Sequence, residues 1–284
     1  MSRDRPVRNR PVRNRSVRNR PVGLIGIPSA RASWFYRLLL LVVRGLGRGV
    51  FGFRTEVLGA ELLPRDASGS PAGSWIAAGL PHRTWVDPFI LADNLPVEPR
   101  LAYFGDGPAI FRSRWRHFVF RRIGGVIPIW PGGRRAAVDA HLAAASQALA
   151  AGCVLCLFPE TGPATPPGTA RPLGFGVAYF ALRTGAPIVP IVLGGSHELY
   201  RGRRFLLQVL PAMTARELAG LPADATLPEP WTPAERDAAH RIVRALHART
   251  AEPIAAAHRA SEPPAGVRKR WRWLTTESCA GDER

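Results

Sequence analysis

The chain has 284 residues, of which 46% are hydrophobic. That is enough to bury a sizeable core, and it excludes a short peptide-like binder. The formal net charge of +18, carried almost entirely by arginine, favours an acidic partner: an anionic lipid surface, nucleic acid or an acidic protein.

The cysteines are expected to be buried thiols. Cys153 and Cys156 lie in the apolar stretch GCVLCLF, which is typical of a strand, and strand residues three apart face opposite sides. A zinc site would need a second ligand pair, and the sequence offers none. We therefore expect no metal ion and no cofactor, and free thiols fit a reducing cytoplasm.

The first segment is a tail rich in arginine. Residues 3–22 repeat a five-residue unit of the type RPVRN, with too few large apolar groups to offset the entropy of ordering it. We expect residues 1–30 to be disordered. Two interpretations stay open: an arginine tether for anionic lipid or nucleic acid, or a solvated tail or mis-assigned start.

Residues 31–53 are predicted to form a helix in the membrane interface. Their longest run without arginine or glycine, residues 38–43, is far shorter than the ~20 residues that span a bilayer. At about 100° per residue, one face is basic and the other apolar, with the arginine side chains expected to reach lipid headgroups. The basic face holds Arg37, Arg44 and Arg48, and the apolar face holds Phe35, Leu39, Val42, Leu46 and Val50. The alternative is an amphipathic helix packed on the protein's own core.

Residues 54–262 are predicted to form one domain in which strands and helices alternate. The strands are expected over residues 53–59, 74–80, 124–130, 153–159 and 187–195, and the helices over residues 88–95, 134–152 and 176–185. A last helix starts at a capping box formed by Thr232 and Glu235, and residues 263–284 are a polar tail. The pattern predicts an α/β fold with a mixed, largely parallel sheet flanked by helices.

His82 and Asp87 form the strongest candidate catalytic pair. They lie in GLPHRTWVDPF, directly after a predicted strand, and Glu160 follows another strand in LFPETG. Functional groups in such folds gather at the carboxyl ends of strands. The alternative is that His82 is an ordinary turn residue and that Asp87 only caps the helix that begins at Pro88.

Four blocks in order, between about Phe53 and Gly202, resemble the glycerolipid acyltransferase family. The first block is H-x4-D, at His82 and Asp87, and the second is GGVIPI, residues 124–129. The third resembles F-P-E-G-T-R at Phe158, Pro159, Glu160, Thr161 and Gly162, and the fourth is the VP strand at Val189 and Pro190. Several blocks at family-like spacing are a far more specific signal than any one of them.

The resemblance implies transfer of a fatty acyl group from a thioester to an alcohol. His82 would be the general base, because imidazole can accept a hydroxyl proton at neutral pH, and Asp87 would select its tautomer and stabilise the imidazolium. Glu160, with the other residues of the third block, would help to hold the polar head of the acceptor; its alternative is a strand-end carboxylate that caps a turn.

The sequence departs from the family pattern at three basic positions. Pro131, Pro163 and Gly174 stand where the family has cations near the acceptor phosphate. Either Arg134, Arg135 and Arg171 substitute for them, or the acceptor has no phosphomonoester, which we slightly prefer.

The expected partners are an acyl-CoA or acyl-carrier-protein donor, a lipid acceptor and a membrane surface, with no nucleic acid. The expected location is the cytoplasmic face of a membrane, peripheral or monotopic, where solvated arginines such as Arg121, Arg122 and those of YRGRR, residues 200–204, would add to surface attraction. The alternatives are a non-catalytic basic protein that coats nucleic acid or anionic membrane, and a hydrolase, for which no G-x-S-x-G elbow is found.

Overall fold

The computed structural model describes residues 29–129, 135–161 and 165–264 of the chain. The arginine-rich repeat and nearly all of the polar tail lie outside these residues. The predictions made for those two segments are therefore not addressed by the structure.

The centre of the molecule is a seven-stranded sheet with the order β1-β7-β6-β2-β5-β3-β4. The strands are β1 (Arg54–Leu58), β2 (Ile76–Leu80), β3 (Leu101–Asp106), β4 (Val126–Ile129), β5 (Val154–Leu157), β6 (Ile188–Gly194) and β7 (Arg204–Val209). All neighbouring pairs are parallel except β6 and β7. The predicted α/β class with a mixed, largely parallel sheet is confirmed.

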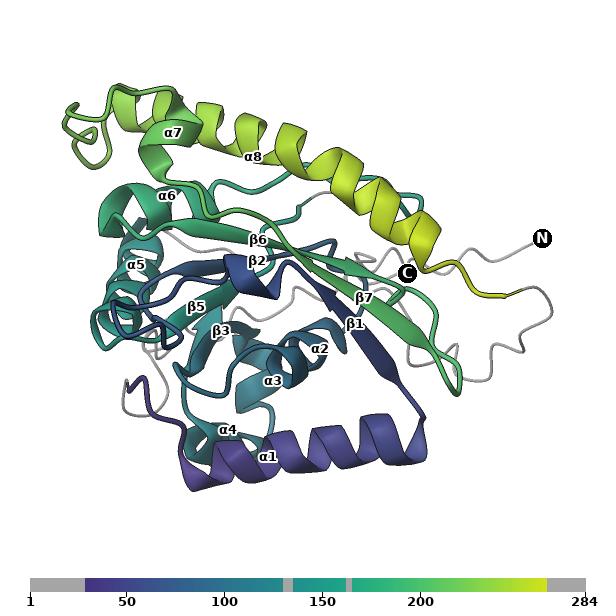
Figure 1. Ribbon diagram of the computed structural model, residues 1–284. Coiled ribbons are helices and arrows are strands. Elements are labelled where there is room, and N and C mark those ends of the chain that lie inside the picture. The colour runs from purple at the N-terminus through teal and green to yellow at the C-terminus, as the bar shows by residue number, and fades with distance from the viewer. Residues whose placement is uncertain (1–28, 130–134, 162–164, 265–284) are drawn as a thin grey trace, which may run out of the picture.

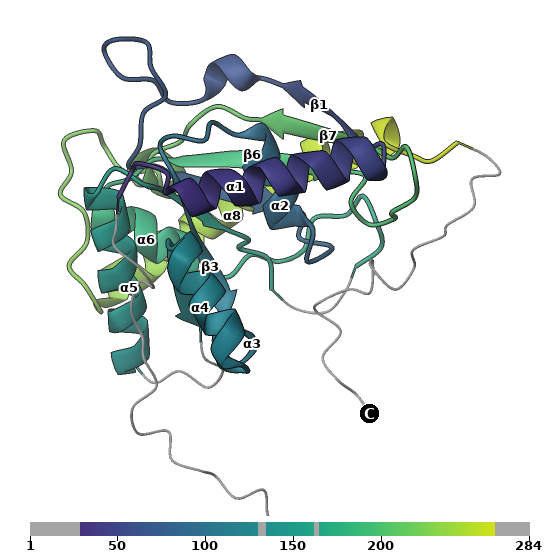
Figure 2. The same ribbon diagram turned by 90° about the horizontal axis from the view of Figure 1, so that it is seen from below.

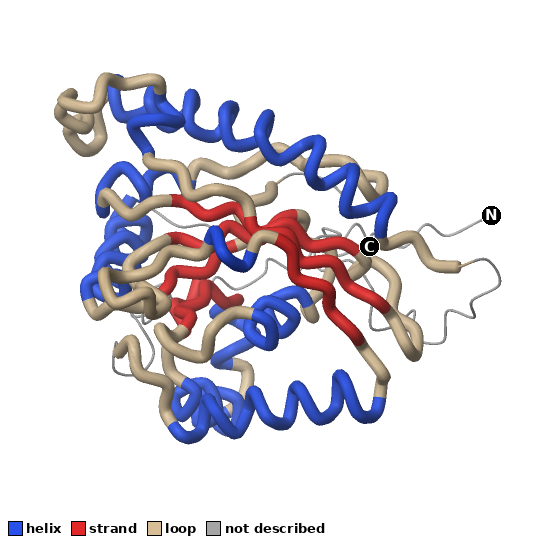
Figure 3. Tube along the Cα trace, viewed as in Figure 1, coloured by secondary structure: helices blue, strands red, loops and turns tan. Residues whose placement is uncertain are grey.

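Helices cover both faces of this sheet (Figures 1 and 3). One face carries α5 (Arg135–Ala150), α6 (Gly176–Thr184), α7 (Ala215–Ala219) and α8 (Pro233–Ala260). The other carries α1 (Trp34–Arg44), α2 (Asp87–Asn94), α3 (Gly107–Phe111) and α4 (Arg114–Ile123). Each helical layer encloses its own apolar cluster against the sheet.

The two cysteines of the fifth strand region illustrate this layering. Cys153 is buried in the cluster beneath α5, α6 and α8, and Cys156 is buried in the cluster beneath α1 and α2. Both are free thiols on opposite sides of the sheet, as the spacing predicted. Among the described residues, no group of three or more potential metal ligands is present.

Several predicted elements are confirmed with their boundaries. Gly185, in the left-handed conformation at φ 70°, ends α6. The side chain of Thr232 caps α8 by accepting the N–H of Glu235. The carboxylate of Glu235, however, accepts the N–H of Trp231 and binds Arg183, so the reciprocal half of the predicted capping box is replaced by an ion pair.

Two strands and three α-helices were not predicted from the sequence: β3, β7, α3, α4 and α7. The predicted solvation of YRGRR holds for Arg201 and Arg204, which are exposed, but is wrong for Arg203, which is only 1% exposed. The Arg203 guanidinium donates to the carbonyl of Gly195 at 2.8 Å and to the hydroxyl of Tyr200 at 3.0 Å.

The N-terminal helix is shorter than predicted and continues as one wide turn. After Arg44 the chain forms the π-helical segment η1 (Gly45–Val50), where three glycines weaken an ordinary α-helix. Tyr36 and Leu40 are buried against the sheet layer. Trp34, Leu38, Leu41, Val42, Leu46 and Val50 are exposed.

The prediction that the arginines of this segment reach outward to headgroups is wrong for two of them. Arg44 and Arg48 both bind the carboxylate of Asp93 on α2, at 2.7 and 3.0 Å. Arg37 binds Glu98 at 2.6 Å. Because Asp93 belongs to α2, Arg44 and Arg48 are directed toward the protein, although the side chains of Arg37 and Arg48 remain 54% and 59% exposed. No described helix is both long and apolar enough to cross a bilayer.

Candidate functional site

The site lies where β2 and β5 end. These neighbouring strands are parallel, with Ala78 opposite Leu157, so the loops that follow them leave the same edge of the sheet. His82 is in the first loop and Glu160 in the second. The backbone N–H of His82 donates to Oε2 of Glu160 at 2.9 Å, which joins the two loops directly.

The predicted pair of His82 and Asp87 is in contact. Nδ1 of His82 lies 2.8 Å from Oδ2 of Asp87. The histidine side chain is 23% exposed, whereas the aspartate side chain is 0% exposed. The shielded carboxylate thus fixes one ring nitrogen, and no described residue forms a hydrogen bond with the other, Nε2.

The alternative in which Asp87 caps the next helix is wrong. The helix α2 begins at Asp87 itself, and Val86 occupies its cap position without a side-chain hydrogen bond. The Asp87 carboxylate instead points back into the preceding turn. It accepts the backbone N–H groups of Arg83 and Thr84 at 2.7 and 2.9 Å, and the Thr84 hydroxyl at 3.3 Å.

Phe158 packs against one face of the His82 imidazole. Its ring stacks on the His82 ring, with centroids 4.2 Å apart and an angle of 24° between the planes. Gly79 on β2 makes room for this stack, because a Cβ there would lie 2.5 Å from Cε1 of Phe158. The imidazole is therefore held by a hydrogen bond at one nitrogen and by an aromatic ring against its face.

Glu160 is held by backbone groups on both oxygens. Besides the His82 N–H, the N–H of Arg171 lies 3.4 Å from Oε1. The backbone around Glu160 forms an isolated antiparallel bridge with Leu173. This pairing explains how a segment more than ten residues further along the chain completes the site.

A second arginine, not singled out in the sequence, ties the two loops together. Arg83 is 3% exposed, and its guanidinium donates to the carbonyls of Thr165, Pro166 and Thr169 at 2.8, 3.3 and 2.9 Å. Nothing in the local sequence signals this role, because the loop that Arg83 binds is about eighty positions away.

A cleft of about 410 Å³ opens beside His82. Its walls come from β3, β4, β5, α5, α6 and the third-block loop, and they are mostly apolar. The lining residues are His82, Phe104, Ile129, Val138, His141, Leu142, Leu157, Phe158, Pro159, Glu160, Thr161, Gly174, Gly176, Val177, Tyr179 and Phe180. A mostly apolar cavity with a few polar groups in its wall suits an amphiphilic substrate.

The predicted cationic residues are placed differently. Arg171 is 2% exposed and does not line the cleft. Arg134 and Gly162 lie outside the described residues, and Arg135 is placed only as the first residue of α5. Pro131 and Pro163, which stand at family cation positions, are likewise outside them.

His141, which lies outside the four sequence blocks, also lines the cleft. Its Nε2 lies 3.0 Å from the carbonyl oxygen of Pro128. The Ala-rich helix prediction placed it correctly on α5, but only the packing of α5 against β4 shows which way it faces.

The Acyltransferase family model matches residues 57–194, the part of the chain that contains His82, Asp87 and the third block. Residues 57–194 are thus an acyltransferase domain, which supports the resemblance to the glycerolipid acyltransferase family. Of the motif residues in this domain, His82, Phe158, Pro159 and Glu160 line the cleft just described, and Asp87 is buried behind His82. The match identifies the protein as an acyltransferase enzyme.

A solved structure supports the fold of this acyltransferase. The crystal structure of the 1-acyl-sn-glycerophosphate (LPA) acyltransferase PlsC from Thermotoga maritima matches with a TM-score of 0.50 and 17% sequence identity, over 78% of this chain and 82% of that one. No curated protein sequence gives a significant match to this acyltransferase.

Proposed function

We propose that this acyltransferase moves a fatty acyl group from a thioester to the hydroxyl of a lysophospholipid or another glycerolipid, with His82 as the general base. The observation that carries the proposal is the contact between Nδ1 of His82 and the buried Asp87, which leaves Nε2 available on the wall of the cleft. The family match supports acyl transfer as the reaction.

The proposed step needs no covalent enzyme intermediate. As the acceptor oxygen attacks the thioester carbon, Nε2 of His82 takes the hydroxyl proton and the carbonyl oxygen gains negative charge. When the tetrahedral intermediate collapses, the carbon–sulfur bond breaks and the imidazolium returns the proton to the leaving thiolate. Asp87 stabilises the transient imidazolium, because its carboxylate already accepts the hydrogen on Nδ1.

Glu160 has a positioning role in this scheme. Both of its oxygens are engaged by backbone N–H groups, so it holds the His82 loop against the third-block loop. Phe158 restricts the ring of His82, and the other third-block residues, Pro159 and Thr161, form the cleft wall next to the acceptor.

The proposal also covers the identity of the acceptor lipid and of the acyl donor. PlsC acts on 1-acyl-sn-glycerophosphate according to its name, which offers one candidate acceptor. The described wall of the cleft carries two histidines, a glutamate and a tyrosine but no lysine or arginine, which favours a head group with hydroxyls or a capped phosphate. The donor is an acyl-CoA or an acyl-carrier-protein thioester.

We place the enzyme at a membrane surface, on the cytoplasmic face, through the exposed apolar side of α1. Trp34 and Leu41 are 66% and 64% exposed there. Large apolar groups that gather on one outer face favour a lipid interface over water.

The test is acyl transfer by the purified protein from labelled acyl-CoA and acyl-carrier-protein donors to a panel of lyso-lipids with and without a phosphomonoester. His82→Ala is expected to lower kcat about 10²–10⁴-fold, the usual contribution of a general base. His240→Ala, on the exposed face of α8, is the matched control. Turnover by His82→Ala at the wild-type rate would remove His82 from the chemistry.

A further inference from the structure

The helix α4 has a basic and aromatic outer face that the acyl-transfer site does not use. At about 100° per residue, Val119, Phe120 and Ile123 share the inner side of this helix. Phe120 and Ile123 pack there on buried clusters. The rest of its circumference carries two neighbouring stripes: Arg114, His117 and Arg121 in one, and Trp115, Phe118 and Arg122 in the other.

The aromatic residues of this outer face are unusually open to solvent. Trp115 is 70% exposed and Phe118 is 43% exposed. Their rings stack with centroids 5.6 Å apart, and the Arg122 guanidinium lies 4.9 Å from the centre of the Phe118 ring. Tryptophan beside arginine on an exposed helix face is typical of the boundary between lipid headgroups and acyl chains.

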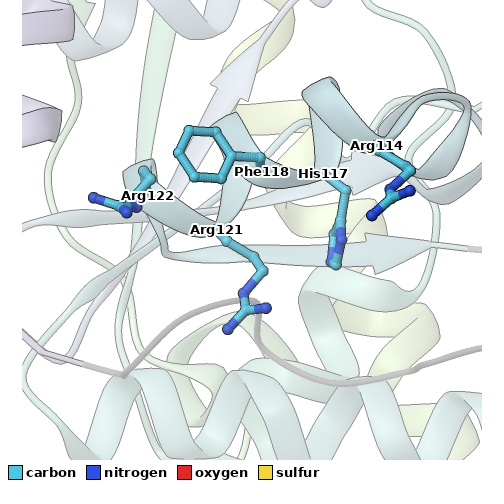
Figure 4. A pocket seen from close by; sticks show the side chains of 5 residues that line it. All are labelled: Arg114, His117, Phe118, Arg121 and Arg122. Atoms are coloured by element: carbon cyan, nitrogen blue, oxygen red, sulfur yellow. The ribbon is translucent and has the colours of Figure 1, made fainter.

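A cleft of about 410 Å³ lies along the same face, lined by Arg114, His117, Phe118, Arg121 and Arg122 (Figure 4). The side chains of His117 and Arg121 extend in the same direction from the helix. No acidic residue lines this cleft among the described residues. Guanidinium groups are the preferred donors to phosphate oxygens, because they can form two parallel hydrogen bonds.

The outer faces of α4 and α1 lie on the same side of the molecule. Both helices are at the bottom in Figure 1 and face the viewer in Figure 2. The hydroxyl of Ser33, which caps α1, donates to the carbonyl of Arg122 at 3.4 Å. The start of α1 is therefore in contact with the end of α4.

We propose that α4 is a second membrane-contact element of this acyltransferase, and that its arginines bind the phosphate groups of anionic phospholipids. The proposal rests on the proposed function only in placing the enzyme at a membrane. An acidic carrier protein would also match the charge, but the exposed Trp115 and Phe118 beside an apolar helix favour a lipid surface.

The test is co-sedimentation of the full-length chain with vesicles of phosphatidylcholine alone and of phosphatidylcholine mixed with phosphatidylglycerol. Arg114→Gln/Arg121→Gln is expected to lower partitioning to the mixed vesicles roughly 25-fold, about fivefold for each arginine near the surface. The matched control is Arg236→Gln/Arg244→Gln, two exposed arginines of α8 on the opposite face, which is expected to change partitioning less than about twofold. Trp115→Ala is expected to weaken binding at unchanged charge. Thermal unfolding checks that each variant is folded.

Equal losses in the two double variants would overturn the proposal, because they would show a dependence on net charge alone. It would also be overturned if the α4 variant bound vesicles normally but lost turnover only with acyl-carrier-protein donors, since that would assign α4 to the donor protein. Vesicle binding requires no catalysis. An absence of acyl transfer would therefore contradict the proposed function without affecting the vesicle-binding result.

Discussion

The carboxylate of Glu160 accepts the backbone N–H of His82 at 2.9 Å and joins the loops that follow β5 and β2. Its other oxygen faces the N–H of Arg171. Glu160→Gln replaces one acceptor with a donor, so one backbone N–H loses its partner. We expect the free energy of unfolding to fall by about 1.5–3 kcal/mol, the contribution of a charged hydrogen bond.

The activity of Glu160→Gln should fall mainly through kcat, because the substitution displaces the backbone segment that carries His82. Urea unfolding and steady-state kinetics measure the two effects, and Glu61→Gln, on the exposed surface, is the control. Wild-type values in both measurements would show that the contact has no positioning role.

Asp87→Asn should preserve the shape of the site but lose the charge behind His82. We expect kcat to fall about 10²–10⁴-fold, because an amide does not stabilise the imidazolium. Thr84→Val is the companion variant: it removes the hydroxyl that donates to Asp87 at 3.3 Å and leaves the imidazole contact in place. This variant should lose about 1 kcal/mol of stability with little change in kcat. Equal kinetic losses in the two variants would contradict a specific role for the His82–Asp87 contact.

Gly79→Ala should disturb the site by displacing Phe158. The added Cβ would lie 2.5 Å from Cε1 of Phe158 and 3.0 Å from Cδ1 of Leu91, so the ring that stacks on His82 must move. We expect about 1–3 kcal/mol of destabilisation from overpacking, together with a lower kcat.

The double variant Gly79→Ala/Phe158→Leu tests that explanation, because leucine is smaller than phenylalanine. Its stability should exceed that of Gly79→Ala alone in thermal unfolding. If the second substitution restored nothing, strain against Phe158 would not be the cause.

The stability of the fold should depend on His197 at acidic pH. Burial, and next the positive charge of Arg203, lower the pKa of His197 to about 4 from its usual value near 6.5. The unfolded chain therefore binds a proton more readily than the folded chain between these values. The stability that neutral His197 contributes is fully present above pH 6.5 and is lost as the pH falls towards 4.

Urea unfolding at neutral pH and near pH 4.5 measures this effect in the wild type and in His197→Gln. The wild type should lose about 1–2 kcal/mol more than the variant over this range, allowing for solvent around a half-buried ring. Identical pH dependence in the two proteins would exclude His197 as the source.

Arg83 shows how a residue can sit inside a recognisable motif without revealing its role. It follows His82 directly, yet its guanidinium binds carbonyls of the loop that contains Thr165 and Thr169. Its burial depends on how that loop folds over the end of the sheet. No local pattern in the sequence distinguishes Arg83 from the other residues between His82 and Asp87.

The missed strands have a similar explanation. The strand β7 follows arginines that were expected to be solvated, and Arg203 is instead buried by its bonds to Gly195 and Tyr200. The strand β3 contains Gly105, which weakens a strand signal. Both strands are stabilised by pairing with neighbours distant in the chain, which no local pattern encodes.

The sequence by itself determined the α/β class, most of the helices and strands, and the pairing of His82 with Asp87, because these depend on apolar runs, end signals and a turn of only a few residues. The tertiary structure alone decided that Glu160 and Arg171 meet the His82 loop, and that Arg44 and Arg48 turn inward to Asp93. The physical reason is that strand order brings distant loops and helices together, and the direction of a charged side chain is set by the partners it then finds.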